Sequence, residues 1–180
     1  ICIEELAMLG VKTFIRIGTT GSISKSLSVG DMLIANAAVR FDGASKSFAP
    51  IEYPAVADFN LVSALKKAAD ELKFSYKIGI CASCDSFYQG QSRMNTYKKS
   101  PLSSESKRLE LLKDMGVLSF EMETATLFVQ AMTYGLRAAS ILGVILNRNE
   151  TESIEHSKIE KIEKKSIRVA LRACALLFSD

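Results

Sequence analysis

Residues 13–21 read TFIRIGTTG, an apolar run followed by two glycines that flank two threonines. The run Thr13–Ile17 is short and rich in β-branched and aromatic side chains, which is typical of a buried β-strand. A glycine at the end of such a run favours a turn, so we expect the strand to stop at Gly18. The same order, an apolar strand and then small or polar residues, returns several times along the chain.

Strands and helices alternate along the rest of the chain. The further strands are expected at Met32–Phe41, Tyr76–Cys81, Val117–Phe120 and Arg137–Leu146, and the helices at Ile1–Leu9, Asp58–Leu72, Ser103–Met115, Glu121–Tyr134 and Glu155–Phe178. The helix over 58–72 has the clearest pattern, because its apolar residues recur every three or four positions and Asp58 can cap its start. The alternation predicts an α/β fold, a three-layer α/β/α sandwich with a mixed central sheet. A length of 180 residues suits one domain, 1–180.

Composition excludes several classes of protein. The net charge is only +3 and the basic residues are scattered, which argues against a nucleic-acid-binding protein. No apolar run reaches the roughly 20 residues of a membrane-spanning helix. Residues 1–10 carry two glutamates and no basic start, unlike a secretory leader. We therefore expect a cytoplasmic protein.

Four cysteines are too few for a disulfide scaffold. Cys81 and Cys84 form a CxxC pair, but the chain has no second such pair and no histidine nearby. A structural role is favoured for this pair, redox or metal chemistry is the alternative, and we predict no metal site. The single histidine, His156, precedes the last helix and is expected on the surface.

Polar residues follow four of the predicted strands. They are Gly18–Gly21, Asp85–Arg93, Glu121–Glu123 and Asn147–Glu150. Ligands of α/β sheets usually bind at the carboxyl ends of the strands, so we expect these four segments to converge on one site.

The segment RIGTTG (16–21) suits an anion. Its glycines allow the backbone to approach closely, its threonine hydroxyls can donate hydrogen bonds, and Arg16 can form two parallel bonds with phosphate oxygens. It lacks the Gly-Lys-Ser/Thr ending of a Walker loop, and a tight turn without a ligand is the competing interpretation.

Two further segments have both a functional and a structural interpretation. In FEMET (120–124), Glu121 and Glu123 either occupy the first turn of a helix, where its dipole favours negative charge, or bind the vicinal hydroxyls of a sugar. In FYQGQSR (87–93), Phe87 can stack on a planar ring, while Gln91 and Arg93 match the carbonyl, N–H, carbonyl edge of a pyrimidine-dione. A solvated turn is the alternative for this second segment.

These segments, in this order, resemble the uridine phosphorylase branch of the nucleoside phosphorylase family. The matching pieces are TFIRIGTTGSI (13–23), VGDMLI (29–34), RFDGASKSFAPIEYPAVADF (40–59), SCDSFYQGQSR (83–93), MGVLSFEMETATL (115–127) and GLRAASILGVILNR (135–148). They extend over almost the whole chain. The DGAS and FAP part of the third piece matches closely but has no evident chemistry of its own.

The resemblance implies phosphorolysis: uridine and inorganic phosphate give uracil and ribose 1-phosphate, in pyrimidine nucleoside salvage, with no cofactor besides phosphate as co-substrate. It implies a phosphate site at Arg16 and Thr19, a base site at Thr20, Gly21, Phe87, Gln91 and Arg93 with Arg148 behind them, and a ribose site at Thr19, Glu121, Met122 and Glu123. The implied catalytic residues are Arg16, Gln91 and Arg93. Arg93 and Gln91 would stabilise the negative charge that gathers on the leaving base.

A purine-preferring nucleoside phosphorylase and a non-catalytic nucleoside-binding relative remain the alternatives. Bacterial-type purine members carry an aspartate in an SDH-like motif where this chain reads LNRN (146–149). The chain has no acid at this place, which favours uridine over adenosine or inosine.

The resemblance also implies a section ahead of the first helix, which would bring a glycine-arginine phosphate loop. A neighbouring subunit would add a histidine to the ribose and an arginine to the phosphate. None of these can be matched in the 180 residues, so we expect a domain that is incomplete at its N-terminus. Whether these residues are active alone stays open. The family assembles as a hexamer built from dimers, and the same homo-oligomer is expected here.

Overall fold

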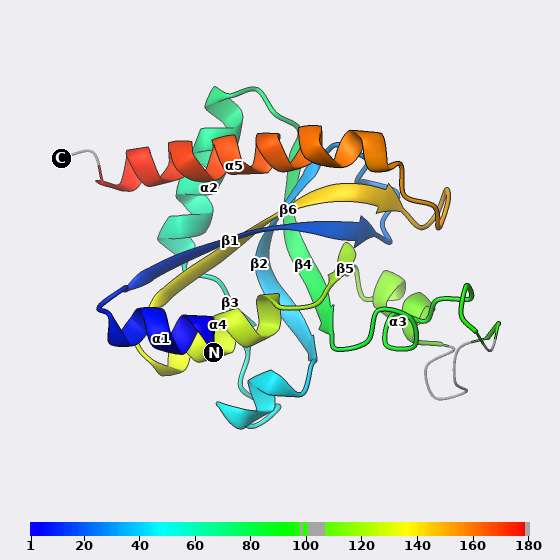
Figure 1. The fold of residues 1–180 in the computed structure, drawn as a ribbon, viewed down its shortest axis with the longest axis horizontal. Helices are drawn as coiled ribbons and strands as arrows, with labels where there is room; N and C mark the ends of the chain where they lie inside the picture. Colours follow the sequence, from blue (N-terminus) through cyan, green and yellow to red (C-terminus); the bar gives the residue numbers. More distant parts are fainter. Residues whose placement is uncertain (98, 101–106, 179–180) are drawn as a thin grey trace.

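The structure is a computed structural model that describes residues 1–97, 99–100 and 107–178. Its helices and strands alternate as predicted (Figure 1). Their order is α1 (Cys2–Met8), β1 (Thr13–Ser22), β2 (Met32–Phe41), the 3₁₀ helix η1 (Ala44–Ser47), β3 (Ala55–Val56), α2 (Phe59–Glu71), β4 (Tyr76–Cys84), α3 (Arg108–Asp114), β5 (Ser119–Glu121), α4 (Thr124–Thr133), β6 (Arg137–Asn147) and α5 (His156–Phe178).

The strands form one mixed sheet in the order β3-β2-β4-β5-β1-β6. The β1–β6, β2–β4 and β4–β5 pairs are parallel, whereas β1–β5, β2–β3 and β2–β6 are antiparallel. This confirms an α/β fold with a mixed sheet. The sheet also closes on itself, since Met32–Ala35 of β2 pair with Ser140–Gly143 of β6. Five strands therefore make a closed barrel, a closure that the predicted sandwich with a mixed central sheet did not include.

The closure depends on a change of partner along β2. The first half of this strand pairs with β6, and its second half, at Ala37 and Ala38, pairs with β3. The register of β2 against β4 shifts between Ala35 and Ala37. Such an irregularity bends a strand and increases its twist, so β2 can serve two different neighbours on one edge.

Helices cover the sheet from two sides (Figure 1). The helices α2 and α5 pack together over one side, where Leu61, Leu65, Ile141 and Val169 belong to one core cluster. On the other side α4 brings Phe128 and its neighbours against the interior of the barrel, and Ile3 of α1 packs at the edge of the same cluster. The helix α3 adds Leu112 to a third cluster beside β5.

The expected stop of the first strand at Gly18 is wrong. The strand β1 continues through Gly18-Thr19-Thr20-Gly21 to Ser22, because its parallel pairing with β6 continues over the whole stretch with one register shift between Thr20 and Gly21. From Thr13 to Thr20 the opposite edge of β1 pairs with no strand in the described part of the chain. RIGTTG is therefore strand backbone, not a tight turn.

Other boundaries shift by a few residues. The strand β4 runs on to Cys84, and Glu121 ends β5 instead of starting α4, which begins at Thr124. The helix predicted over 103–115 is described only from residue 107 onward, and its residues 103–106 lie outside the described residues. The predicted cap of α2 is confirmed, since the Leu61 N–H donates to Asp58 Oδ1 over 2.9 Å.

The two cysteines of the CxxC pair lie on opposite faces of β4. Cys81 packs in the cluster that includes α4, and Cys84 packs in the cluster beside α3. Residues three apart on a strand point in opposite directions, so the two thiols cannot meet. None of the four cysteines, all of which lie in the described ranges, forms a disulfide bond. His156 is exposed and is the first residue of α5, one position later than predicted.

Within the ranges 1–97, 99–100 and 107–178, no helix is both long and apolar enough to cross a membrane. The same residues contain no group of histidine, cysteine and acidic side chains that could hold a metal ion.

Candidate active site

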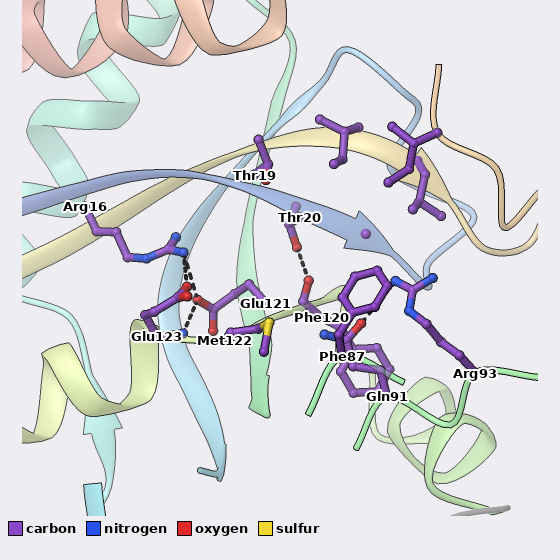
Figure 2. Close-up of a pocket in the computed structure, with 14 residues that line it drawn as sticks. Arg16, Thr19, Thr20, Phe87, Gln91, Arg93, Phe120, Glu121, Met122 and Glu123 are labelled. Carbon is purple, nitrogen blue, oxygen red and sulfur yellow. Dashed lines mark hydrogen bonds and ion pairs between the residues drawn. The ribbon is translucent and has the colours of Figure 1, made fainter. Parts of the chain in front are cut away.

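One cavity of about 170 Å³ lies where the ends of β1, β5 and β6 meet the loop after β4 (Figure 2). Its walls are made by Arg16, Thr19, Thr20, Gly21, Phe87, Gln91, Arg93, Phe120, Glu121, Met122, Glu123, Ile145, Leu146 and Ile154. Every residue predicted for the site except Arg148 is among them. The structure thus brings together segments that are up to about 130 residues apart in the sequence because they share one end of the barrel.

Arg16 projects from β1 toward the start of α4, as Figure 2 shows. Its Nη2 forms an ion pair with Glu123 and lies 3.6 Å from Glu121 Oε2. Its Nη1 is buried and has no hydrogen-bond partner among the described residues. A buried donor without a partner is costly, so this nitrogen marks a place for an acceptor from outside the chain, such as an anion.

The two glutamates of FEMET have different surroundings. Glu121 has a side chain only 1% exposed, and its Oε2 accepts the backbone N–H groups of Glu123 and Thr124, each over 2.9 Å. Its Oε1 accepts the hydroxyl of Ser83. Glu121 therefore holds the first turn of α4 from the end of β5, whereas the structural interpretation of the sequence placed it within that turn. The Glu123 side chain is 60% exposed and lines the cavity, so its carboxylate is accessible from outside the chain.

Thr20 connects two walls of the cavity. Its hydroxyl donates to the carbonyl oxygen of Phe120 over 2.7 Å (Figure 2). This bond holds β5 against the end of β1, where only Gly21 and Ser22 pair with that strand. Thr20 is nearly fully buried, so its hydroxyl contributes to the shape of the cavity.

Phe87, Gln91 and Arg93 form the wall opposite Arg16 (Figure 2). The Arg93 guanidinium carbon lies 4.0 Å from the centre of the Phe87 ring, and Arg93 Nη2 donates to Gln91 Oε1 over 3.1 Å. Arg93 Nε is buried without a hydrogen-bond partner in the described chain. Burial, and then the nearby charge of Arg148, lowers the pKa of the Arg93 guanidinium below its ordinary value. An aromatic face, an amide and a guanidinium thus surround one side of the cavity.

Arg148 lies behind this wall and does not line the cavity. Its Nη1 donates to the Gln91 carbonyl oxygen over 2.6 Å, and its Nη2 donates to that of Ser92 over 3.3 Å. Its Nε donates to Glu152 Oε1 over 2.6 Å, while Glu152 Oε2 accepts from Arg93 Nη1 over 2.5 Å. One carboxylate therefore bridges two buried arginine side chains and offsets part of their positive charge.

Sequence reasoning missed Glu152 and the apolar part of the cavity wall. Glu152 follows β6 in an irregular segment, and its spacing of four from Arg148 was the only available signal. Phe120, Ile145 and Ile154 also line the cavity. They resembled ordinary core residues, because nothing in their local pattern distinguishes a cavity wall from a packed interior.

Comparison with known proteins agrees with the arrangement of these residues. Residues 2–179 match the phosphorylase superfamily. Uridine phosphorylase of Haemophilus influenzae is 45% identical over 179 residues, which are 99% of this chain and 71% of that protein. Uridine phosphorylase of Escherichia coli is 42% identical over 177 residues, 98% of this chain and 70% of that protein. Guanosine phosphorylase of Halorubrum lacusprofundi is 31% identical over 175 residues, 96% of this chain and 67% of that protein. The chain therefore belongs to the phosphorylase superfamily and is a homologue of the uridine phosphorylases.

Proposed function

We propose that this protein is a uridine phosphorylase, a pentosyltransferase that converts uridine and inorganic phosphate into uracil and ribose 1-phosphate. One observation carries the proposal. A single cavity is bounded at one end by Arg16, with its unpaired buried Nη1 and its partner Glu123, and at the other by Gln91 and Arg93. These groups have the chemistry for a phosphate, a ribose diol and a pyrimidine-dione, in this order. The identities of 42–45% to two uridine phosphorylases support the same conclusion.

The phosphate is the nucleophile in this proposal, and no cofactor takes part. Arg16 and Thr19 hold the phosphate, and Arg16 donates to it through Nη1. Glu123 accepts the ribose hydroxyls, and Met122 and Thr19 pack against the sugar. Glu121 orients this junction by holding the first turn of α4. The attacking phosphate oxygen forms the new bond to the anomeric carbon, while the bond from that carbon to the base breaks.

The base leaves with the electron pair of the broken bond. In the transition state, positive charge develops on the ribose beside the phosphate, and negative charge develops on the uracil. Gln91 and Arg93 donate hydrogen bonds to the uracil carbonyls, Phe87 packs on the ring, and Thr20 and Gly21 complete the base site. Arg148 acts from behind by binding the backbone carbonyls of Gln91 and Ser92. Donors fixed before the reaction stabilise such a charge without rearranging during it.

The residues at the end of β6 support uridine over a purine nucleoside. A purine phosphorylase needs a proton donor beside the leaving purine. Here Asn147 is buried and its amide donates to the carbonyl oxygens of Ser24 and Leu27, over 3.2 and 2.8 Å. The Arg148 guanidinium donates its hydrogen bonds to the backbone carbonyl oxygens of Gln91 and Ser92 and to the Glu152 carboxylate. The polar side chains of Asn147 and Arg148 thus serve the scaffold, and neither is a carboxylic acid that could protonate a leaving purine.

The wider organisation is also part of the proposal. We propose that residues 1–180 form one domain, in which the helices on the two sides of the barrel give a three-layer α/β/α order. We further propose that the protein works in the cytoplasm as a homo-oligomer based on dimers. The helices on both sides of the sheet in Figure 1 support the layered order.

The experiment is a phosphorolysis assay on the protein expressed from its natural gene, following uracil release from uridine with and without phosphate. We expect release that depends on phosphate, and a preference for uridine over inosine in competition. Arg93→Ala should lower kcat/KM by about 10²–10³, while Arg172→Ala on the surface of α5 should not. Uridine binding without release would overturn the proposal in favour of a non-catalytic nucleoside-binding protein. Faster release of hypoxanthine from inosine than of uracil from uridine would instead show a purine nucleoside phosphorylase.

A further inference from the structure

The segment Asp42-Gly43-Ala44-Ser45 follows β2 outside the cavity, and nothing proposed so far gives it a role. Asp42 is 1% exposed, and both of its carboxylate oxygens are used. Oδ2 accepts the Ser45 N–H and the hydroxyl of Thr126, each over 2.6 Å, and Oδ1 accepts the Ser45 hydroxyl over 2.8 Å. Thr126 lies in the first turn of α4, three residues after Glu123. Asp42 therefore connects the end of β2 to the helix that follows the sugar-binding junction.

The next residue, Gly43, contacts the other half of the site. Its N–H donates to Asp85 Oδ2 over 2.7 Å. Asp85 is the first residue after β4 and begins the loop that carries Phe87, Gln91 and Arg93. A Cβ atom on Gly43 would lie 3.2 Å from Asp85 Oδ2, which is a tight contact. Two successive residues thus connect to the two halves of the cavity wall.

Arg40 makes this connection rigid. It is buried, and its guanidinium donates to the hydroxyl and the carbonyl oxygen of Ser45 over 3.0 and 3.1 Å. It also donates to the carbonyl oxygens of Ala49 and Pro50 over 2.8 and 2.6 Å. A charged group that serves several backbone carbonyls at once fixes the path of the chain around it. The segment after β2 therefore has little freedom to follow a movement of either half of the site.

We propose that Asp42 and Gly43 form a clamp that sets the distance between two halves of the cavity. The ribose half is the wall at Met122 and Glu123, and the base half is the wall at Phe87, Gln91 and Arg93. The inference rests on the proposed function. Asp42, Gly43, Thr126 and Asp85 are positioning residues, since none of them lines the cavity of the site. Uridine binds both halves at once, whereas free uracil binds only the base half. The clamp therefore matters for uridine more than for uracil.

Thr126 allows a matched pair of variants. Thr126→Val removes the hydroxyl at nearly constant volume, and Thr126→Ser keeps it. We expect Thr126→Val to raise the KM for uridine about threefold to tenfold, with kcat changed less than twofold. Its Kd for uracil, measured by calorimetry, should stay within about twofold of the wild type. Thr126→Ser should resemble the wild type in all three quantities. An equal loss of uridine and uracil binding, or no loss at all, would overturn the clamp.

The second anchor is examined with Asp85→Ala and Asp85→Asn. The alanine variant loses the acceptor of the Gly43 N–H, while the asparagine variant keeps an amide oxygen at the same reach. Because both anchors act through one segment, Thr126→Val and Asp85→Ala together should raise the KM for uridine little more than the worse of the two alone. Multiplied effects would mean that the two contacts act independently, against the proposal.

Amide hydrogen exchange tests the clamp independently of the proposed reaction. The N–H groups of Ser92 and Arg93 donate to the carbonyl oxygens of Gln89 and Tyr88 within the base loop. We expect Thr126→Val, but not Thr126→Ser, to accelerate exchange in this loop although Thr126 does not belong to it. Unchanged exchange would overturn the clamp even in an active enzyme. Accelerated exchange in a protein that releases no uracil would support the clamp and refute the proposed function alone.

Discussion

The guanidinium of Arg16 lies against the backbone of Gly18, two residues further along the same strand. A Cβ atom at Gly18 would be 2.2 Å from Arg16 Nη1 and 2.8 Å from its Cζ. Residues two apart on a strand point to the same face, so only a residue without a side chain lets the arginine lie along the strand in this way. The glycine is needed here for space.

Gly18→Ala should therefore displace the Arg16 guanidinium. We expect the KM for phosphate to rise about tenfold or more, because the donor Nη1 no longer lies at the phosphate site proposed above. Uracil affinity should change little, since Gln91 and Arg93 are at the other end of the cavity. Initial rates at varied phosphate and calorimetry with uracil measure the two quantities.

Gly21→Ala is the matched control on the same strand. The nearest atoms to a Cβ there would be Arg93 Nη2 and Leu146 Cγ, both at 3.6 Å, which is an ordinary contact. We expect an unchanged KM for phosphate and, at most, a modest effect on uridine. If both alanine variants raise the KM for phosphate equally, the contact between Arg16 and Gly18 does not contribute specifically to phosphate binding.

Ser92 has a left-handed backbone, with φ of +52°, between Gln91 and Arg93. This conformation costs a residue with a Cβ about 1–2 kcal/mol. Ser92→Gly removes this backbone cost from the free energy of unfolding and should leave uracil binding unchanged. Ser92→Val should lower both, since a β-branched residue resists this conformation and would shift the two base-binding side chains. Urea unfolding and uracil calorimetry on the two variants give the comparison.

Glu152 forms ion pairs with Arg93 and Arg148 at once and reduces the repulsion between them. Glu152→Gln keeps the size of the side chain but removes its charge, so the two arginines repel each other and the base loop loosens. We expect the KM for uridine to rise about threefold to tenfold, with a smaller change in kcat. Glu150→Gln changes an exposed residue in the same segment and should have no such effect. Equal behaviour of the two variants would contradict the role given to Glu152.

The buried Cys81 thiol should make the free energy of unfolding depend on pH. Burial, and then the charge of Glu121, raises the pKa of the Cys81 thiol well above its ordinary 9.0. Above pH 9 the unfolded chain releases this proton while the folded chain keeps it, so the folded state loses stability as the pH rises. The loss is up to about 1.4 kcal/mol per pH unit, starting near pH 9 and continuing up to the pKa of the folded state.

Cys81→Ala removes this contribution. Its free energy of unfolding should fall less between pH 8 and about pH 10 than that of the wild type, whatever the cost of the lost sulfur at pH 8. Cys2→Ala is the control, because Cys2 is exposed. Parallel pH profiles for the wild type and Cys81→Ala would refute the prediction.

The sequence predicted best what depends on neighbours along the chain. The helix α2 has its apolar residues on one face and its cap at Asp58, both within a few positions, and its bounds were found within one residue. The strand β2 was predicted with its exact ends for a similar reason, since Gly30 and Asp31 mark its entry and Asp42 its exit. The polar ends of strands also indicated which segments meet at the cavity.

What the sequence did not predict depends on partners far along the chain. The strand β1 continues past Gly18 only because β6 lies beside it, and a local glycine signal cannot show this. The closure of the barrel needs β2 to change its partner halfway, between residues of the same apolar character. The role of Glu152 could be recognised only from the structure, in which Arg93 and Arg148 both contact its carboxylate.

The closure of the barrel also sets how the chain must fold. The pairs β1–β6 and β2–β6 join the first quarter of the sequence to its last quarter, so the ring closes only after a long loop has lost its freedom. Contacts of such long sequence separation slow folding. During synthesis at about 5–20 residues per second, β1 and β2 leave the ribosome several seconds before β6. For this interval the edges of β1 and β2 that pair with β6 have no native partner, and the nascent chain is at its most vulnerable to association with other chains.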